Sequence, residues 1–551
     1  MIRRVTTSLL VLLATGWVAA QSKLDMDPEF YCTGDRSNEY FRKDFGPPDQ
    51  FADLYKANCG IYYLCIAGSP ASTKTITQNQ CQTELYFDIQ QQICDRKRQV
   101  TNCEVITKKH PPQPIWPLPE GAVSNCPGDE IECGSGECMP KNRFCDGTPD
   151  CADDSDENAC TPDKDPNRAD VCDPRTCQWD QGCFCSVDGT LIPGGLTVDQ
   201  TPQMITITFT GAINERNFRI FQDIFKDTVK HKGNECTPKG TFFVSHAFTN
   251  YSAVQELHRV GHEIGVSSIT NNDNPNYWSG LSSLDYESEM DGARIIVEKF
   301  ANISANEILG LRVPKQRVGG NKQFRMMVDW GFLYDSSISA PMGRLPLWPY
   351  TLMHRMPHKC LGTDQNCPSQ NFTVWEMVVN ELDRRDDPQF DEKLTGCHFV
   401  DQCANLQTPN QFRRFLDNNL ARHFRTNRAP LGLQFTSAYF ETRRDFLKVL
   451  VKWVRETAEA GDYYFVTMQQ VINWMEAPTE IAAIKDFQEW KGKCDVKGQP
   501  YCSLPNPCNK KVPRIFPNEQ EMFLYTCMEC PRTYPWLGDP LGNGFLDFNN
   551  F

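Results

Sequence analysis

Residues 204–209, Met-Ile-Thr-Ile-Thr-Phe, alternate apolar and polar side chains at the period of two that is typical of a β-strand. Apolar residues then recur at helical spacing in Phe218, Phe221, Ile224 and Phe225. This alternation of strand and helix predicts a parallel sheet closed as a distorted β/α barrel, whose working residues lie at the carboxyl ends of the strands. Further strand patterns lie at residues 241–244, 263–266, 308–311, 431–435 and 463–466.

Composition and the first residues indicate the compartment. The chain has 551 residues, too many for one core, and its 26 cysteines predict disulfides formed in an oxidising environment. Arg3 and Arg4 precede an apolar run at residues 9–14 and small residues at 18–20, which predicts a signal peptide over residues 1–20. No later stretch reaches about 18 apolar residues, so we expect a secreted protein without a membrane span. The net charge of −14 disfavours nucleic acid as a partner.

The cysteines divide the chain into domains. Those expected to pair within two small blocks are Cys32, Cys59, Cys65, Cys81, Cys94, Cys103, Cys126, Cys133, Cys138, Cys145, Cys151 and Cys160. Cys527 and Cys530 have a zinc-like spacing, but we expect them in disulfides. The expected organisation is a signal peptide at 1–20, a first cysteine-rich domain at 22–104, a Pro-rich spacer at 105–125, a second cysteine-rich domain at 126–160, a connector at 161–202, the α/β domain at 203–480 and a disulfide-rich extension at 481–551.

Aromatic residues lie between the cysteines of the first block. Such a small domain cannot bury a large core, so disulfides, each contributing about 3 kcal/mol, supply the constraint and leave aromatic rings exposed to stack on sugars. The alternative is that these rings form the small core. The cysteine spacing resembles that of the peritrophin-A type of chitin-binding domain. The resemblance implies chitin as the partner, and we expect it to be bound by Tyr62, Tyr63, Tyr86 and Phe87.

The second block concentrates carboxylates between cysteines, as in residues 145–157, Cys-Asp-Gly-Thr-Pro-Asp-Cys-Ala-Asp-Asp-Ser-Asp-Glu. Clustered carboxylates are stabilised by Ca²⁺, which takes six or more oxygen ligands. The alternative is a solvated acidic turn. The block resembles the LDL-receptor class A module, and the resemblance implies side-chain ligands at Asp146, Asp150, Asp156 and Glu157. Backbone carbonyls of Arg143 and Thr148 would complete the calcium shell.

The stretch from about residue 165 to the end resembles the insect chitin deacetylases of the polysaccharide deacetylase (NodB-type) family. The motifs that carry the resemblance include Gly240-Thr-Phe-Phe-Val-Ser-His, Gly261-His-Glu-Ile, Pro346-Leu-Trp-Pro-Tyr-Thr-Leu and Ala429-Pro-Leu-Gly-Leu. Together with the two upstream modules, they resemble the architecture of the chitin-binding group of these enzymes. The resemblance implies a polysaccharide deacetylase-type barrel and a place in a cuticle or peritrophic-type chitin matrix.

Deacetylation of an N-acetyl group requires a metal-activated water, a carboxylate base and an acid. Where active relatives have Phe-Asp-Asp, this chain has Phe209-Thr210-Gly211, and no base or metal carboxylate remains. Ser267 and Asn271 stand at the positions of the two metal-binding histidines, and Thr436 at that of the acid histidine. Only Arg312 of an Arg-x-Pro motif is retained; its expected role is to hold loop geometry, with a sugar contact as the alternative. We therefore expect no catalytic residues and no catalytic Zn²⁺.

Two histidine pairs have a spacing that can bind zinc on one helix face, His258 with His262 and His354 with His358. Gly261 is expected to end the helix before His262, and Pro357 interrupts the second pair. No carboxylate and histidine set accompanies either pair. We therefore interpret all four as packed or loop histidines.

The leading hypothesis is a catalytically inactive chitin deacetylase homologue that binds or organises chitin outside the cell. The first alternative is an active metal-dependent deacetylase that uses unrecognised residues. The second is a matrix protein whose calcium module binds partners, such as other matrix proteins or active chitin deacetylases. Asn-X-Ser/Thr triplets at Asn250, Asn302 and Asn371 are candidate glycosylation sites.

Overall fold

The structure is a computed structural model that divides into two compact units, Met1–Gln113 and Pro114–Phe551. Neither the expected signal peptide nor the Pro-rich spacer lies within the described residues. Of the first unit, the structure describes residues 40–41, 61–67, 74–81, 85–88 and 93–96. Of the second, it describes residues 126–544 apart from 129, 147–149, 158–159, 161–163, 179–181, 362–365, 386–395, 404–405, 493, 495, 497, 503 and 512–520.

The first unit is a small β module. A three-stranded antiparallel sheet has the order β1-β2-β3, and β4 and β5 form a separate antiparallel hairpin. A disulfide joins Cys81, directly after β3, to Cys94 in β5. The predicted disulfide-rich β architecture is confirmed. The strands are β1 (Tyr40–Phe41), β2 (Ile61–Ala67), β3 (Lys74–Gln80), β4 (Leu85–Asp88) and β5 (Ile93–Arg96).

The second cysteine block forms one end of the second unit. Its antiparallel hairpin, β6 (Glu130–Glu132) and β7 (Cys138–Pro140), leads into a single 3₁₀ turn, η3 (Lys141–Arg143). Three disulfides hold it, Cys126–Cys138, Cys133–Cys151 and Cys145–Cys160. The apolar core is little more than Phe144 with the Cys133–Cys151 bridge, so the disulfides supply most of the constraint.

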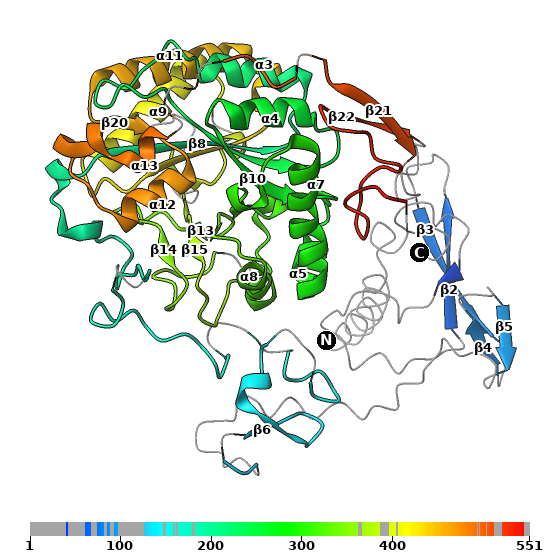
Figure 1. The fold of residues 1–551 in the computed structure, drawn as a ribbon. Coiled ribbons are helices and arrows are strands. Elements are labelled where there is room, and N and C mark those ends of the chain that lie inside the picture. Colours follow the sequence, from blue (N-terminus) through cyan, green and yellow to red (C-terminus); the bar gives the residue numbers. More distant parts are fainter. Residues whose placement is uncertain are drawn as a thin grey trace, which may run out of the picture. The chain divides into compact units, whose positions relative to one another are not determined.

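A curled sheet forms the centre of the large domain (Figure 1). Its order is β14-β15-β12-β11-β10-β9-β8-β19, with β20 also paired to β8, and all pairs are parallel except β14 with β15. The predicted parallel α/β architecture is confirmed. Among the described strands, β14 and β19 end the path without pairing to each other, so the sheet is a half-barrel. The strands are β8 (Gln203–Gly211), β9 (Thr241–Ser245), β10 (Glu263–Ser268), β11 (Gly310–Leu311), β12 (Tyr334–Asp335), β14 (Tyr350–Thr351), β15 (Trp375–Glu376), β19 (Leu431–Thr436) and β20 (Tyr463–Phe465).

Helices pack around this sheet because each presents one apolar stripe to it (Figure 1). Phe221 of α3, for example, packs with its ring centroid 4.6 Å from that of Phe209 in β8 and 4.9 Å from that of Phe242 in β9. The helices are α3 (Glu215–Ile224), α4 (Tyr251–Arg259), α5 (Pro275–Gly280), α6 (Ser283–Tyr286), α7 (Gly292–Ala301), α8 (Gly320–Asp329), α9 (Pro409–Phe424), α10 (Tyr439–Thr442), α11 (Arg444–Ala460), α12 (Met468–Glu476) and α13 (Gln488–Lys491).

The C-terminal extension adds the antiparallel pair β21 (Asn506–Lys511) and β22 (Glu521–Thr526). Disulfides Cys502–Cys527, Cys508–Cys530 and Cys236–Cys494 tie it together and to the α/β domain. The prediction that Cys527 and Cys530 are in disulfides is therefore confirmed. Within the described part of the chain, we find no helix with the length and apolar character needed to cross a bilayer.

Candidate functional site: a degenerate strand-end cleft

The carboxyl ends of the central strands hold the positions that the sequence singled out. Thr210 and Gly211 end β8, Ser267 lies at the end of β10, and Thr436 ends β19. Thr436 pairs in register with Thr210 across the parallel β8–β19 ladder. Sequence reasoning therefore places these residues at one edge of the sheet, as the structure does.

Arg312 fills the space beneath the Thr210 side chain. Its side chain is fully buried, and its Nη1 donates hydrogen bonds to Thr208 Oγ1 at 2.7 Å and to Thr210 Oγ1 at 3.2 Å. Nε and Nη2 donate to the carbonyl oxygen and the Oγ of Ser336, each at 2.9 Å. The guanidinium also lies 4.3 Å from the centroid of the Phe243 ring. Burial lowers the pKa of Arg312 to about 10, which still leaves it a cation at neutral pH. Its hydrogen-bond acceptors are all neutral, so the guanidinium is held in place by uncharged protein groups.

Gly211 adopts a backbone conformation that suits glycine, with φ +127°. A Cβ atom at this position would lie 2.7 Å from the Oγ of Ser437. Any side chain there is therefore strained by the backbone and meets Ser437. A metal-binding carboxylate is absent here, and a side chain at this position would require the Ser437 side chain to shift.

The β10 end offers no imidazole. The Ser267 side chain is fully buried, and its Oγ has no hydrogen-bond partner among the described residues. Asn271 is exposed with φ +46°, and its backbone N donates to Ser268 Oγ at 2.9 Å. The loop is fixed by a residue that the sequence did not single out, the buried Glu289. It accepts hydrogen bonds from Ile269 N at 3.1 Å, Thr270 N at 3.0 Å and Tyr277 Oη at 2.7 Å.

Thr436 contacts a carboxylate that sequence reasoning missed. Asp401 belongs to the 3₁₀ turn η10 (Val400–Gln402), and its Oδ1 accepts from Thr436 Oγ1 while its Oδ2 accepts from Thr436 N at 3.0 Å. Burial raises the pKa of Asp401 despite these hydrogen bonds. The only local signal was the pair of cysteines, Cys397 and Cys403, that closes the loop around it.

A buried acidic pair lies behind Arg312. Asp335 Oδ1 accepts from Gln323 Nε2 at 2.9 Å and from Ser337 Oγ at 2.7 Å, and Glu376 Oε1 accepts from Ile338 N at 3.3 Å. Burial raises the pKa of both carboxyl groups, and that of Glu376 is raised further by the charge of Asp335. Neither side chain is exposed, so this pair belongs to the interior of the domain.

The histidine pairs do not converge. His262 is buried and its Nδ1 accepts from Gly240 N at 3.1 Å, whereas His258 Nε2 lies 3.2 Å from Glu307. His358 Nε2 lies 2.8 Å from Tyr350 Oη. His354 lies near the sulfur atoms of Cys177, Cys183 and Cys185, a group with metal-like spacing, but the three cysteines are in disulfides. Another imidazole, His246, directly follows β9; it is buried between Tyr251 Oη at 2.7 Å and the Pro535 carbonyl at 2.8 Å. A fully buried imidazole with both nitrogens engaged is not available to a metal.

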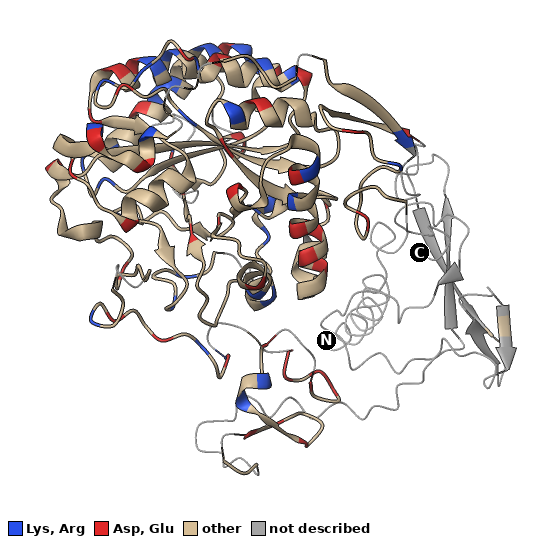
Figure 2. Ribbon diagram, in the orientation of Figure 1, with Lys and Arg blue, Asp and Glu red and all other residues tan. Residues whose placement is uncertain are grey.

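The small acidic module carries carboxylates suited to a cation. Asp156 is fully buried; its Oδ2 accepts from Asp150 N at 2.7 Å, but its Oδ1 and the Oδ2 of Asp150 have no hydrogen-bond partner among the described residues. Arg143 Nη1 lies 3.8 Å from Asp146 Oδ2 and 3.6 Å from Asp150 Oδ2. Figure 2 shows acidic positions of this module, in red, near its basic turn, in blue. Buried carboxylate oxygens without donors fit the hard oxygen shell of Ca²⁺. Glu157 is half-buried, and Thr148 lies outside the described residues.

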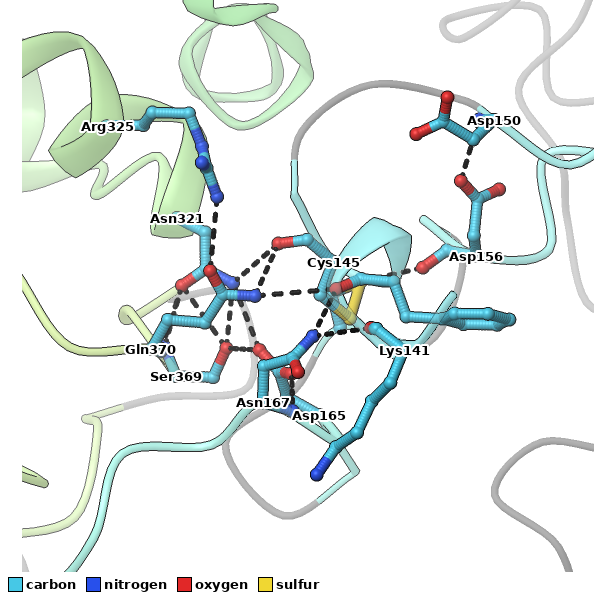
Figure 3. The surroundings of a disulfide bond; sticks show 12 residues. Lys141, Cys145, Asp150, Asp156, Asp165, Asn167, Asn321, Arg325, Ser369 and Gln370 are labelled. Atoms are coloured by element: carbon cyan, nitrogen blue, oxygen red, sulfur yellow. Dashed lines mark hydrogen bonds between the residues drawn. A yellow bond between two sulfur atoms is a disulfide. The ribbon is translucent and has the colours of Figure 1, made fainter. Parts of the chain in front are cut away.

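This module is hydrogen-bonded to the α/β domain through its own backbone (Figure 3). The Cys145 carbonyl accepts from Asn321 Nδ2 at 3.2 Å and from Gln370 Nε2 at 2.8 Å. Asn167 Nδ2 donates to the carbonyls of Lys141 at 2.8 Å and of Phe144 at 2.9 Å. Asn321 is itself fixed by Ser369, whose N donates to its Oδ1 at 2.9 Å. The turn that would bind calcium is therefore held on the domain by buried amides.

The expected sugar-binding residues lie on strands of the first unit. Tyr62 and Tyr63 are consecutive in β2, and Tyr86 and Phe87 are consecutive in β4. Among the cysteines of this block, the structure describes the Cys81–Cys94 bridge. Cys32, Cys59 and Cys103 lie outside the described residues, as do the side chains of Cys65 and of the four aromatic residues.

The sequence as a whole is similar to that of a known enzyme. Over 514 residues it is 45% identical to chitin deacetylase 1 of Bombyx mori, which covers 93% of this chain and 92% of that protein. The chain belongs to the chitin deacetylase family. Chitin deacetylase 8 of Bombyx mori is 30% identical over 381 residues, covering 68% of this chain and 94% of that protein.

The two upstream modules of this chitin deacetylase family member match domain families of their own. Residues 46–103 match the chitin binding peritrophin-A domain, and residues 124–160 match the low-density lipoprotein receptor domain class A. Both resemblances seen in the sequence are thereby confirmed. The chain is a chitin-binding, chitin deacetylase-like protein.

Solved deacetylases overlay this member of the chitin deacetylase family only loosely. A putative polysaccharide deacetylase from Mycobacterium smegmatis gives a TM-score of 0.32 at 16% identity, covering 52% of this chain and 94% of that one. The chitin deacetylase of Colletotrichum lindemuthianum gives 0.27 at 12% identity, covering 52% and 92%. Scores this low carry no argument about the cleft, which has to be interpreted from its own residues.

Proposed function

We propose that this member of the chitin deacetylase family is a secreted chitin-binding matrix protein whose α/β domain does not remove acetyl groups. The observation that carries the proposal is the contact of Arg312 with Thr210, next to a glycine whose positive φ disfavours a side chain. A neutral hydroxyl cannot act as a base near neutral pH.

The chemistry lost at this edge is large. Removal of a general base or acid reduces the rate by roughly 10²–10⁴-fold each, and loss of the metal removes several kcal/mol of transition-state stabilisation. Such losses are not additive, because the groups act as a unit. Even the smallest of these losses leaves little turnover, and here Thr210, Gly211, Ser267, Asn271 and Thr436 all depart from the family pattern.

The test is acetate release from chitin oligosaccharides by the full chain, together with its metal content. We expect no acetate above the level of buffer, and no stoichiometric zinc or cobalt. The matched comparison is the variant that restores the family residues in one chain, T210D/G211D/S267H/N271H/T436H. Gain of zinc by that variant with none in the wild type supports the proposal. Chelator-sensitive acetate release by the wild type would contradict it and favour the active enzyme.

An active enzyme has one residue in its favour. Asp401 supplies a carboxylate with a raised pKa at the strand edge, in contact with Thr436. If that alternative is correct, Asp401→Asn abolishes acetate release by the wild type. If the proposal is correct, neither protein releases acetate.

Chitin binding is assigned to the first unit, because residues 46–103 match the peritrophin-A family. Consecutive strand positions alternate between the two faces of a sheet, so Tyr62→Ala and Tyr63→Ala are compared singly and together. We expect the double variant to be released from chitin beads that retain the wild type. Exposed Tyr501→Ala, in the C-terminal extension, is the control. Retention of the double variant at the wild-type level would place the binding elsewhere.

A further inference from the structure

A basic groove lies along helix α9 of the α/β domain. It encloses about 600 Å³ between helix α9 and strand β17 (Leu382–Asp383), within the size range of ligand pockets. The strand-end residues described above do not line this groove, namely Thr210, Gly211, Ser267, Asn271 and Thr436. Its described lining is Asp383, Arg384, Arg385, Leu406, Gln411, Arg414, Phe415, Asn418, Ala421, Arg422, Arg425 and Thr426.

Among the residues that the structure describes, much of the positive charge in this groove has no acidic partner. Asp383 is the one acidic residue among the described lining residues, and Arg385 Nε donates to its Oδ1 at 3.0 Å. Within the part of the chain that the structure describes, the side chains of Arg384, Arg414 and Arg425 form no ion pair. The groove therefore attracts anions although the whole chain has a net charge of −14.

The adjacent residue on the same helix shows the contrast. Arg413 is not among the described lining residues and forms two ion pairs, with Asp417 at 2.8 Å and with Glu456 at 2.6 Å. Arg413 thus finds two carboxylates, whereas Arg384, Arg414 and Arg425 form no ion pair with any residue that the structure describes.

Helix stability does not account for the pattern. Arg422 and Arg425 lie at the carboxyl end of α9, where cations are favoured by the helix dipole, but as an i, i+3 pair they repel each other. Arg414 lies in the first half of α9, and Arg384 belongs to the segment after β17. Arg422 is held in place by donating to the Gly343 carbonyl at 2.9 Å, which fixes one guanidinium at the groove.

The neutral part of the lining has the chemistry of a sugar site. Leu406, Phe415 and Ala421 contribute apolar atoms to the lining, although Leu406 and Phe415 are largely buried, and Gln411 and Thr426 give polar groups for hydroxyls. We propose that this groove binds an anionic saccharide, a sugar chain that carries sulfate or carboxylate groups. Neutral chitin offers the arginines no charge, and its cationic deacetylated form is repelled. The site is thus a second glycan site, independent of the proposed inactivity of the cleft and of chitin binding by the first unit.

The experiment uses the full chain and three fluorescent probes of matched length, namely a dextran sulfate oligosaccharide, uncharged dextran and polyglutamate. Fluorescence anisotropy at about 0.05 M salt, where screening is weak, gives the dissociation constants. We expect dextran sulfate to bind more tightly than polyglutamate, and uncharged dextran to bind at least tenfold more weakly than its sulfated form. The variant R384Q/R414Q/R425Q is expected to weaken dextran sulfate binding by on the order of tenfold or more.

The control removes three exposed positive charges outside the groove, K226Q/K448Q/K485Q, and is expected to change the affinity by less than about twofold. Thermal melting of both variants checks that they fold. Absence of dextran sulfate binding by the wild type, or equal losses in the two variants, would overturn the site. Polyglutamate binding as tightly as dextran sulfate would assign the groove to an acidic peptide instead, and equal binding of uncharged dextran would remove the role of charge.

Discussion

The guanidinium of Arg312 lies 3.2 Å from the Oγ1 of Thr210, the residue that replaces the expected catalytic base. Arg312, which the sequence singled out as the one family residue expected to be retained, donates to neutral oxygens of threonine and serine. Arg312 is thus packed beneath Thr210, and its guanidinium donates no hydrogen bond to a carboxylate among the described residues. A carboxylate introduced at position 210 would lie next to this guanidinium, so its effect on the free energy of unfolding can be predicted.

Thr210→Asp places a carboxylate against Arg312 and is expected to raise the free energy of unfolding at pH 7 by about 1 kcal/mol, the charge-assisted hydrogen bond exceeding the desolvation of the new carboxylate. The ion pair lowers the pKa of the new aspartate in the folded state. Its stabilisation is therefore complete above about pH 4 and is lost as pH falls through the lowered value. Urea unfolding between about pH 3 and pH 7 measures this.

Thr210→Asn has nearly the same shape without the charge and serves as the comparison. If the asparagine and aspartate variants unfold alike at every pH, Arg312 does not hold a charge that this cleft can use. No acetate release is expected from either variant.

Gly211→Ala is expected to lower the free energy of unfolding by about 1–3 kcal/mol, because φ is +127° and the Cβ meets Ser437 Oγ at 2.7 Å. Gly461→Ala is a matched control, since Gly461 has φ +133° but no atom within 4 Å of its Cβ position. The difference between the two variants isolates the contact with Ser437. Equal effects in thermal or urea unfolding would mean that Ser437 moves aside and that a side chain at 211 is tolerated.

Local pattern was enough to locate the strands and their ends. The alternation in residues 204–209 and the apolar runs at 241–244 and 431–435 predicted β8, β9 and β19, because such periodicity reflects burial of one or both strand faces. Since carboxyl ends of parallel strands meet at one edge, Thr210 and Thr436 could be expected together. The open path of the sheet was not predictable in this way, because strands such as β11 and β12 have only two residues each.

Contacts between distant segments were beyond the sequence. Asp401 and Thr436 are 35 residues apart, and nothing in the spacing of charges indicates their hydrogen bonds. The same holds for Asn321, which lies 176 residues from the Cys145 carbonyl that it contacts. Such polar contacts are specified by the packed fold, whereas periodicity carries information only about single elements.

The difference in unfolding free energy between Glu376→Gln and the wild type is expected to move in favour of the variant as pH rises. Burial and the charge of Asp335 raise the pKa of Glu376, so its stabilising contribution is complete below about pH 4.3 and is lost as pH rises through the raised value. Glutamine does not titrate, so the difference in unfolding free energy grows by at most about 1.4 kcal/mol per pH unit. Urea unfolding from about pH 4 to pH 8 measures it. The exposed Glu459→Gln is the control for the substitution itself, and a pH-independent difference for Glu376→Gln would exclude a buried charge at that position.

Calcium binding by the small module is expected to depend on its contacts with the α/β domain. Cys145 lies between two expected ligands, the Arg143 carbonyl and the Asp146 side chain. The Cys145 carbonyl accepts hydrogen bonds from the amides of Asn321 and Gln370. These amides therefore fix the turn that presents the ligands, so the turn loses less conformational entropy when calcium binds. We expect N321A/Q370A to weaken calcium binding about fivefold, which corresponds to about 1 kcal/mol. Calorimetry on the full chain measures it.

The coupling has a reciprocal side, because linkage requires calcium to stabilise the docked arrangement by the same factor. Calcium should therefore slow amide hydrogen exchange in helix α8 (Gly320–Asp329), which begins beside Asn321, and removal of calcium with a chelator should speed it. The double variant should lose this response, whereas Asn276→Ala with Gln488→Ala, two exposed amides away from the contact, should keep it. If N321A/Q370A binds calcium with unchanged affinity, or if calcium does not change amide hydrogen exchange in α8, the module binds its ion independently of its contacts with the α/β domain. The hydrogen bonds to the Cys145 carbonyl would then serve only to anchor the chain.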